Sequence, residues 1–180
     1  MRKFEIYIVL SVVLVTSLIS TTFAEKEFTE YESDLLGIQL SFPQDWEKIM
    51  NEETLDWSDE KSDRISFNFD ENTFVVLVKD SDKETLQEII QDSVDSSHRM
   101  SSYSESEMNL IDLTDTTLSG ERAKKTIFEQ TIFGKSSKVL QVKSLVDGKE
   151  YTITYRSNID KFDEHLSNVE KIIDSIKILN

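Results

Sequence analysis

Residues 37–46, GIQLSFPQDW, carry the strongest local signal in this sequence. The apolar side chains from Ile38 to Phe42 alternate with polar ones, which is the period of a β-strand with one buried face. Pro43 removes an amide donor and fixes φ, so the strand is expected to end there. Trp46 follows at once. We expect its ring to fold back and close the end of the core, rather than to stack on a ligand.

Strand patterns continue beyond the proline. Residues 46–49 are predicted to form a second short strand, and residues 51–63, NEETLDWSDEKSD, an acidic connection. Alternation returns from Ile65 to Phe69 and is followed by the continuous apolar run FVVLVK at residues 74–79. This pair predicts a hairpin in which the second strand is covered on both faces.

The period then changes to that of a helix. Ser81 and Glu84 form an S-x-x-E pattern, which predicts a capping box at a helix N-terminus. Apolar residues between positions 86 and 94 recur at helical spacing, so one face of this helix should be buried. Residues 96–107, SSHRMSSYSESE, show no periodicity and are expected to form an exposed loop.

The second half predicts a β-meander that ends in a helix. Asp147 and Gly148 mark a tight hairpin turn, because both central residues of such a turn need positive φ. The expected strands are residues 110–117, 123–132, 138–146 and 149–156, and the expected closing helix spans residues 162–176. The sequence therefore predicts an α+β fold, in which an antiparallel β-sheet of about seven strands is covered by helices.

The N-terminus predicts a targeting segment. Two basic residues precede an uncharged stretch at residues 6–24, and small side chains lie just before a potential cleavage site at Ala24. This is the layout of a secretory signal peptide at residues 1–24, which leaves a single domain at residues 25–180. The alternative is an uncleaved membrane anchor, the only membrane association that we expect. The expected location is secreted or otherwise extracytoplasmic.

The charge balance is strongly acidic. There are 35 acidic and 20 basic residues, so the formal net charge is −15 at pH 7. Such a surface repels phosphate backbones and argues against nucleic acid as a partner, whereas it attracts cations or a basic protein. The chain has no cysteine, and a domain of this length can be stable on an export route without disulfides.

Four stretches together resemble the PsbP-like domain family. The first is the glycine, alternating strand, proline and tryptophan of residues 37–46. The others are LSGERAKKTIFEQ at residues 118–130, GKEYTITYRS at residues 148–157 and FDEHLSNVEKIIDSIKI at residues 162–178. The resemblance extends over roughly residues 31–178.

The resemblance implies an α/β/α sandwich and a non-catalytic accessory or binding module. The best-known members are extrinsic subunits of photosystem II that help to retain calcium and chloride near the manganese cluster. Many relatives are secreted proteins of non-photosynthetic microbes. This sequence lacks the long basic N-terminal extension with which photosynthetic members dock. The resemblance therefore implies a secreted microbial member rather than the photosystem subunit itself.

No catalytic signature is present. The sequence has two histidines, no cysteine, no G-x-S-x-G and no H-E-x-x-H, so we expect no enzyme activity. We expect instead a protein partner in the envelope or at the cell surface. The candidate contact residues lie in the two irregular segments, because loops carry recognition more often than strands do. They are Trp57 in the acidic connection and His98, Arg99 and Tyr103 in the serine-rich segment.

An alternative function is the binding of a small ligand or a divalent cation such as calcium; no other cofactor is expected. Asp56, Asp59, Glu60 and Asp63 crowd the acidic connection around Trp57. Clustered carboxylates could coordinate a hard divalent cation weakly. The competing interpretation is a solvated acidic loop without a ligand.

Overall fold

The computed structural model describes residues 27–55, 61–103 and 106–179. Within these ranges the chain forms ten β-strands, two α-helices and one short 3-10 helix. The strands build two antiparallel sheets, one of seven strands and one of three. The predicted α+β class and the antiparallel sheet of seven strands are therefore confirmed, whereas the smaller sheet was not expected.

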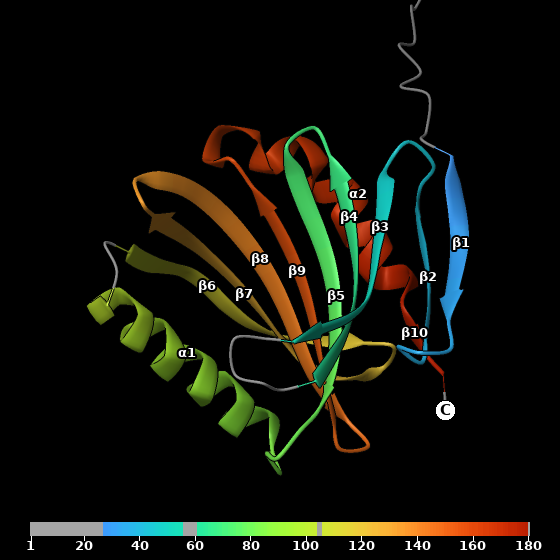
Figure 1. Ribbon diagram of the computed structural model, residues 1–180, viewed down its shortest axis with the longest axis horizontal. Helices are drawn as coiled ribbons and strands as arrows, with labels where there is room; N and C mark the ends of the chain where they lie inside the picture. Colours follow the sequence, from blue (N-terminus) through green and yellow to red (C-terminus); the bar gives the residue numbers. More distant parts are fainter. Residues whose placement is uncertain (1–26, 56–60, 104–105, 180) are drawn as a thin grey trace, which may run out of the picture.

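The large sheet has the strand order β3-β4-β5-β9-β8-β7-β6, so β3 and β6 are its edges. Successive strands form hairpins, and the exception is β5, which pairs with β9 (Figure 1). Its strands are β3 (Glu47–Leu55), β4 (Lys61–Phe69), β5 (Asn72–Asp80), β6 (Ser106–Leu118), β7 (Glu121–Ile132), β8 (Lys135–Val146) and β9 (Lys149–Ser157).

The small sheet contains the strand of the motif at residues 37–46. Strand β2 (Ile38–Pro43) pairs on one side with β1 (Phe28–Ser33) and on the other with the two-residue β10 (Lys177–Ile178). The Leu179 amide also donates to the Gly37 carbonyl at 2.8 Å, and Gly37 has a φ of +60°. These bonds hold the C-terminal segment against the glycine that opens the motif.

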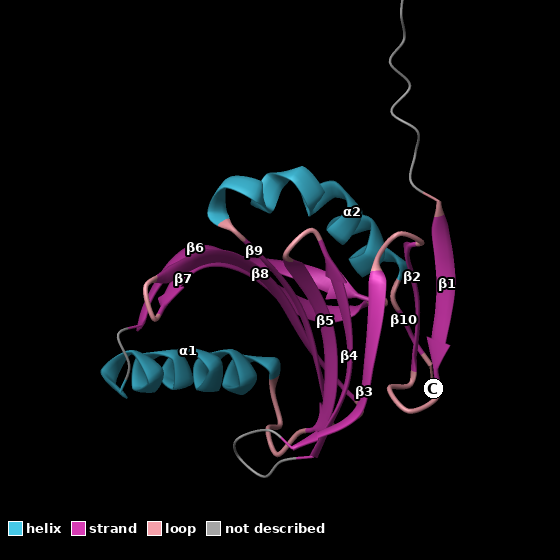
Figure 2. Ribbon diagram, turned by 45° about the horizontal axis from the view of Figure 1, so that its top comes forward, coloured by secondary structure: helices cyan, strands magenta, loops and turns pink. Residues whose placement is uncertain are grey.

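The two helices lie on opposite sides of the large sheet. The sheet is strongly curved: α2 (Phe162–Ser175) covers its outer side, and α1 (Leu86–Tyr103) lies under its arch (Figure 2). A 3-10 turn, η1 (Ile159–Lys161), leads from β9 into α2. Since α2 and the small sheet occupy one side and α1 the other, the two faces of the sheet have different environments.

The main core lies on the α2 side. It combines one face of the large sheet with the apolar stripe of α2 and the buried face of β2. The Tyr155 hydroxyl donates to the Phe162 carbonyl at 3.1 Å and so links β9 to the start of α2. The buried side chains of α2 are Phe162, Val169, Ile172 and Ile173, which confirms the apolar face of the predicted closing helix.

Trp46 closes the core as predicted. Its side chain is 4% exposed, and its ring stacks on Phe69 with a centroid distance of 3.5 Å and an interplanar angle of 6°. The Trp46 amide donates to the Pro43 carbonyl at 3.1 Å, so the proline ends β2 in a tight turn that carries the chain into β3. Since the ring is buried among aromatic side chains, it is a packing residue.

The capping box was predicted one turn too early. The Glu88 amide donates to Thr85 Oγ1 at 3.2 Å, and the Thr85 amide donates to Glu88 Oε2 at 3.0 Å. This reciprocal pair caps α1. Ser81 Oγ instead accepts the Lys83 amide at 3.1 Å, which makes a local turn before the helix.

Two predicted irregular segments are largely regular. Helix α1 continues to Tyr103 and β6 begins at Ser106, so the expected loop at residues 96–107 was wrong. Likewise, β3 reaches Leu55 and β4 begins at Lys61, so the acidic connection is shorter than predicted. The hairpin turn at Asp147 and Gly148 is confirmed, with φ values of +49° and +76°.

Candidate functional site

The two faces of the large sheet differ in chemistry. On β9, Tyr151, Ile153 and Tyr155 are buried in the main core. Side chains alternate across a strand, so Thr152, Thr154 and Arg156 point to the opposite face, beneath α1. That face carries polar and apolar side chains together, and α1 covers only part of it.

A groove of about 510 Å³ lies between α1 and this face. Its volume is within the usual range of roughly 300–1,000 Å³ for small-molecule sites. Five elements contribute to its lining. The lining residues are Ile90, Ser93 and Val94 from α1, Met108 and Leu110 from β6, Thr126, Phe128 and Gln130 from β7, Val139, Gln141 and Lys143 from β8, and Thr154 and Arg156 from β9.

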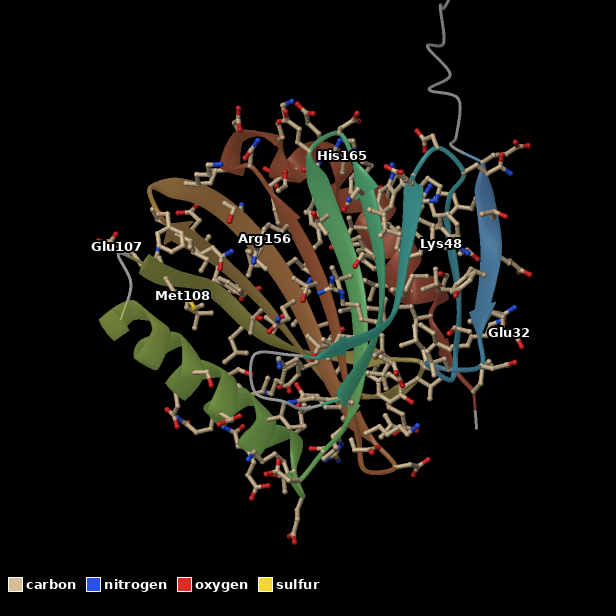
Figure 3. The ribbon with its side chains drawn as sticks, viewed as in Figure 1. Glu32, Lys48, Glu107, Met108, Arg156 and His165 are labelled. Carbon is tan, nitrogen blue, oxygen red and sulfur yellow. The ribbon has the colours of Figure 1, made fainter. Side chains whose placement is uncertain are left out.

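The strand register arranges part of this lining in a row. Leu110 pairs with Phe128, Phe128 with Val139, and Val139 with Arg156. Paired residues in an antiparallel sheet project to the same face, so three apolar side chains lead directly to a guanidinium group. Figure 3 labels Arg156 on β9, and Met108 on β6 beside α1.

The groove is apolar on the helix side and at its β6 edge. Val94 is 42% exposed, Met108 44% and Leu110 55%, whereas Ile90 and Val139 are buried at its inner end. Ile90 and Val139 do not belong to the main core cluster, so the contact of α1 with the sheet is a separate, smaller one. The mouth of the groove therefore exposes apolar side chains that no described element covers completely.

The neutral polar side chains in the groove are held by hydrogen bonds. Gln141 Nε2 donates to Thr154 Oγ1 at 3.2 Å, and Thr126 Oγ1 donates to the Gln141 carbonyl at 3.3 Å. Gln130 Nε2 donates to Ser137 Oγ at 3.2 Å. These bonds join β7, β8 and β9 across the floor, so the shape of the floor is fixed.

A buried ion pair lies beside the groove. Lys143 Nζ is 2.6 Å from Glu150 Oε1, and the two side chains are 13% and 9% exposed. Thr152 Oγ1 also donates to Glu150 Oε1, at 3.1 Å. Burial acts to raise the pKa of Glu150, but the Lys143 ammonium and the hydrogen bonds outweigh it, so this pKa lies below its ordinary value. Glu150 therefore stays ionised and fixes Lys143.

The described lining of the groove contains no carboxylate and no imidazole, because none of its residues is a histidine, an aspartate or a glutamate. His165 is on α2, on the other side of the sheet, where its ring meets Phe69 edge-on and its Nε2 is 3.8 Å from Asp70 Oδ2. The arrangement can bind and orient a molecule through apolar contact, hydrogen bonds and positive charge.

Most of the acidic-connection candidates lie outside the described residues. These are Trp57 and the carboxylates Asp56, Asp59 and Glu60. The remaining candidate, Asp63, lies half-buried on β4 opposite Val78. Across the described ranges, no group of three or more histidine, aspartate or glutamate side chains is placed to hold a metal ion.

The second set of contact candidates lies on a helix instead of in a loop. His98, Arg99 and Tyr103 belong to the C-terminal half of α1. The groove begins on the same helix, one to two turns earlier, at Ile90, Ser93 and Val94. Their predicted role in partner contact remains a prediction.

The groove was not predicted from the sequence. A signal for it was present in β7 and β8, where Phe128 and Val139 fall on the face opposite the main core, among polar residues. An apolar residue on the otherwise polar face of a strand indicates a second packing or binding surface. The pattern of one strand does not show which element covers that surface.

Comparison with known proteins shows similarity of structure only. A scan against protein-family models finds no match, and neither does a search of curated proteins. Among solved structures, cyanobacterial PsbP from Synechocystis aligns with a TM-score of 0.64 and 12% identity, over 87% of this chain and 95% of that one. The LpqN protein of Mycobacterium tuberculosis is described as involved in cell envelope biogenesis. It aligns with a TM-score of 0.54 and 13% identity, over 86% of this chain and 91% of that one.

A Pseudomonas aeruginosa protein of unknown function, described as a putative regulator, aligns with a TM-score of 0.54 and 12% identity, over 81% of this chain and 92% of that one.

In the described part of this chain, neither helix is long and apolar enough to cross a membrane. The alignments span nearly the whole described chain, and they agree with the resemblance carried by the motifs at residues 37–46 and 118–178. The chain has the PsbP-like fold.

Proposed function

We propose that this protein is an extracytoplasmic, non-catalytic binding module whose binding site is the groove between α1 and the large sheet. The observation that carries the proposal is the groove itself. It is of ligand size, its floor is fixed by hydrogen bonds, and its mouth exposes Val94, Met108 and Leu110. Concave sites with mostly apolar walls and a few placed polar groups are typical of small-molecule binding.

The chemistry of the lining supports binding without turnover. The described lining offers hydroxyls, amides and two basic side chains, but no carboxylate or imidazole to move a proton. Lys143 is engaged by Glu150 at 2.6 Å, so it is poorly suited to act as a nucleophile. Each polar group is suited to orienting a ligand.

Two observations support an extracytoplasmic site of action. The first is the signal-peptide pattern at residues 1–24, which lie outside the described residues. The second is the shared fold with LpqN, which is described as involved in cell envelope biogenesis. The proposal places the binding event in the envelope or outside the cell.

A second candidate function is contact with a protein partner through strand β6. This strand is an edge of the large sheet, and Leu110, Ile111 and Leu113 are 55%, 48% and 45% exposed. An exposed edge strand can pair with an extended segment of another chain. The net charge of −15 favours a basic partner.

The test of the groove is a thermal-shift screen of the purified chain against amphiphiles, amino acids, sugars and divalent cations. A ligand that binds only the folded state raises Tm. Val94→Trp should fill the mouth and abolish the shift, whereas Gln91→Trp, an exposed position of α1 that does not line the groove, should retain it. If every shift survives Val94→Trp, the groove is not the site.

A further inference from the structure

We propose that the groove takes one monomeric, single-chain amphiphile with an anionic head group, a carboxylate or a phosphate. The apolar tail would lie across β6, β7 and β8, and the head group would lie at Arg156 on β9. This inference rests on the proposed binding function of the groove and names the chemical class of its ligand.

The tail site is the row Leu110, Phe128 and Val139. The row is continuous through three paired strands, and Ile90 and Val94 of α1 face it from the other wall. Burying hydrocarbon between these walls removes the exposed apolar surface at Val94 and Leu110 from water. An apolar chain therefore fits the row better than a sugar or an amino acid does.

The head-group site follows from the charges of the lining. The protein carries 35 acidic residues, yet the two charged side chains in the described lining, Lys143 and Arg156, are both basic. The row of apolar side chains ends at Arg156, which pairs with Val139, so the guanidinium lies where the head group of a chain along that row would lie. Guanidinium groups bind carboxylates and phosphates through two parallel hydrogen bonds.

The dimensions match one chain. Neighbouring strands are about 4.8 Å apart, so the three steps from Leu110 to Arg156 span about 14 Å. The volume of about 510 Å³ leaves room for a single tail and not for a bilayer surface. The ligand is therefore a monomer taken from solution.

The experiment is isothermal titration of the purified chain with decanoate and with decyl phosphate, each below its micelle concentration. Decanol tests the tail without charge, decyltrimethylammonium tests reversed charge, and butyrate tests a carboxylate with almost no tail. Vesicles containing anionic phospholipid test a membrane surface. We expect both anionic amphiphiles to bind about tenfold tighter than decanol. The other three probes should bind more weakly than decanol.

Two variant pairs locate the head and the tail. Arg156→Gln should weaken the binding of decanoate about tenfold and leave the affinity for decanol unchanged. Lys149 is an exposed residue on the same strand outside the groove, so Lys149→Gln should change neither affinity. Val94→Trp should weaken the binding of both decanoate and decanol, whereas Gln91→Trp should change the binding of neither.

Equal affinity for decanol and decanoate, binding only to vesicles, or no effect of Arg156→Gln would overturn the anionic-head inference. If decanol binds and this binding is lost in Val94→Trp, the proposal that the groove is a binding site would still hold. Failure of all probes to bind would overturn the inference, and the thermal-shift panel would then decide the groove separately.

Discussion

At the scale of single residues, Trp46 joins the small sheet to the core of the large one. Its ring stacks on Phe69 and lies 6.3 Å from the ring of Phe74, and its indole Nε1 is buried without a hydrogen-bond partner among the described residues. A buried donor without a partner carries a cost. The aromatic contacts must outweigh that cost.

Trp46→Ala should therefore lower the free energy of unfolding by about 3 to 5 kcal/mol, because it leaves a large cavity beside Phe69. Trp46→Phe is the matched control, because it keeps a stacked ring and removes the unpartnered donor. It should lower the free energy of unfolding clearly less than Trp46→Ala does. Urea titration measures both. A loss below about 1 kcal/mol for Trp46→Ala would mean that the ring does not close the core.

Glu150 links stability to pH at the same scale. Its pKa is lowered in the folded protein, so its contribution is full above its ordinary pKa of 4.5 and is lost as pH falls through the lower folded-state value. Glu150→Gln should cost about 2 kcal/mol at neutral pH, because Lys143 loses a charged partner. The difference between the two proteins should shrink as pH falls below 4.5. A difference that is independent of pH would argue against the ion pair as its source.

At the scale of elements, the start of α1 offers a sharp test. Thr85→Ala removes the side-chain oxygen that accepts the Glu88 amide, so it should cost about 1 kcal/mol. Ser81→Ala, at the position that the sequence pattern favoured, should cost no more than about 0.5 kcal/mol, because Ser81 caps only a local turn. Denaturant titration of the pair decides between the two caps. A larger loss of stability for Ser81→Ala than for Thr85→Ala would favour the capping box at Ser81 and Glu84 instead.

Elements with a strong local period were predictable, and elements that depend on distant pairing were not. The alternation in β2 and the positive φ at Asp147 and Gly148 are local properties, so the sequence predicted them. Strand β10 exists only because Lys177 and Ile178 pair with β2, far away in sequence. The serine-rich end of α1 has no apolar stripe of its own, so its helical state could not be read from periodicity.

At the scale of the whole molecule, the curved sheet separates two tasks. One face and α2 form the stable core, and the other face is only partly covered by α1, which leaves the groove. The fold class could be predicted because it follows from element order. The groove could not, because it depends on where α1 lies over residues such as Phe128 and Val139, and only the tertiary structure fixes that position.

The cellular location of the protein is a further prediction for the whole molecule. We expect the mature chain to begin at Glu25 and to be found outside the cytoplasmic membrane, because small residues precede a cleavage site at Ala24. N-terminal sequencing of native material measures this directly. A chain that retains Met1 in the membrane fraction would support the anchor instead.

The central claim is that the groove is the binding site, and the most direct measurement is a map of amide chemical shifts. The ¹⁵N-labelled chain is titrated with decanoate and, separately, with decanol. We expect saturable shifts in α1 near Ile90 and Val94 and in β6 to β9 near Phe128 and Arg156, with little change in the small sheet or α2. Saturable shifts concentrated on β1, β2 or α2 would contradict the claim.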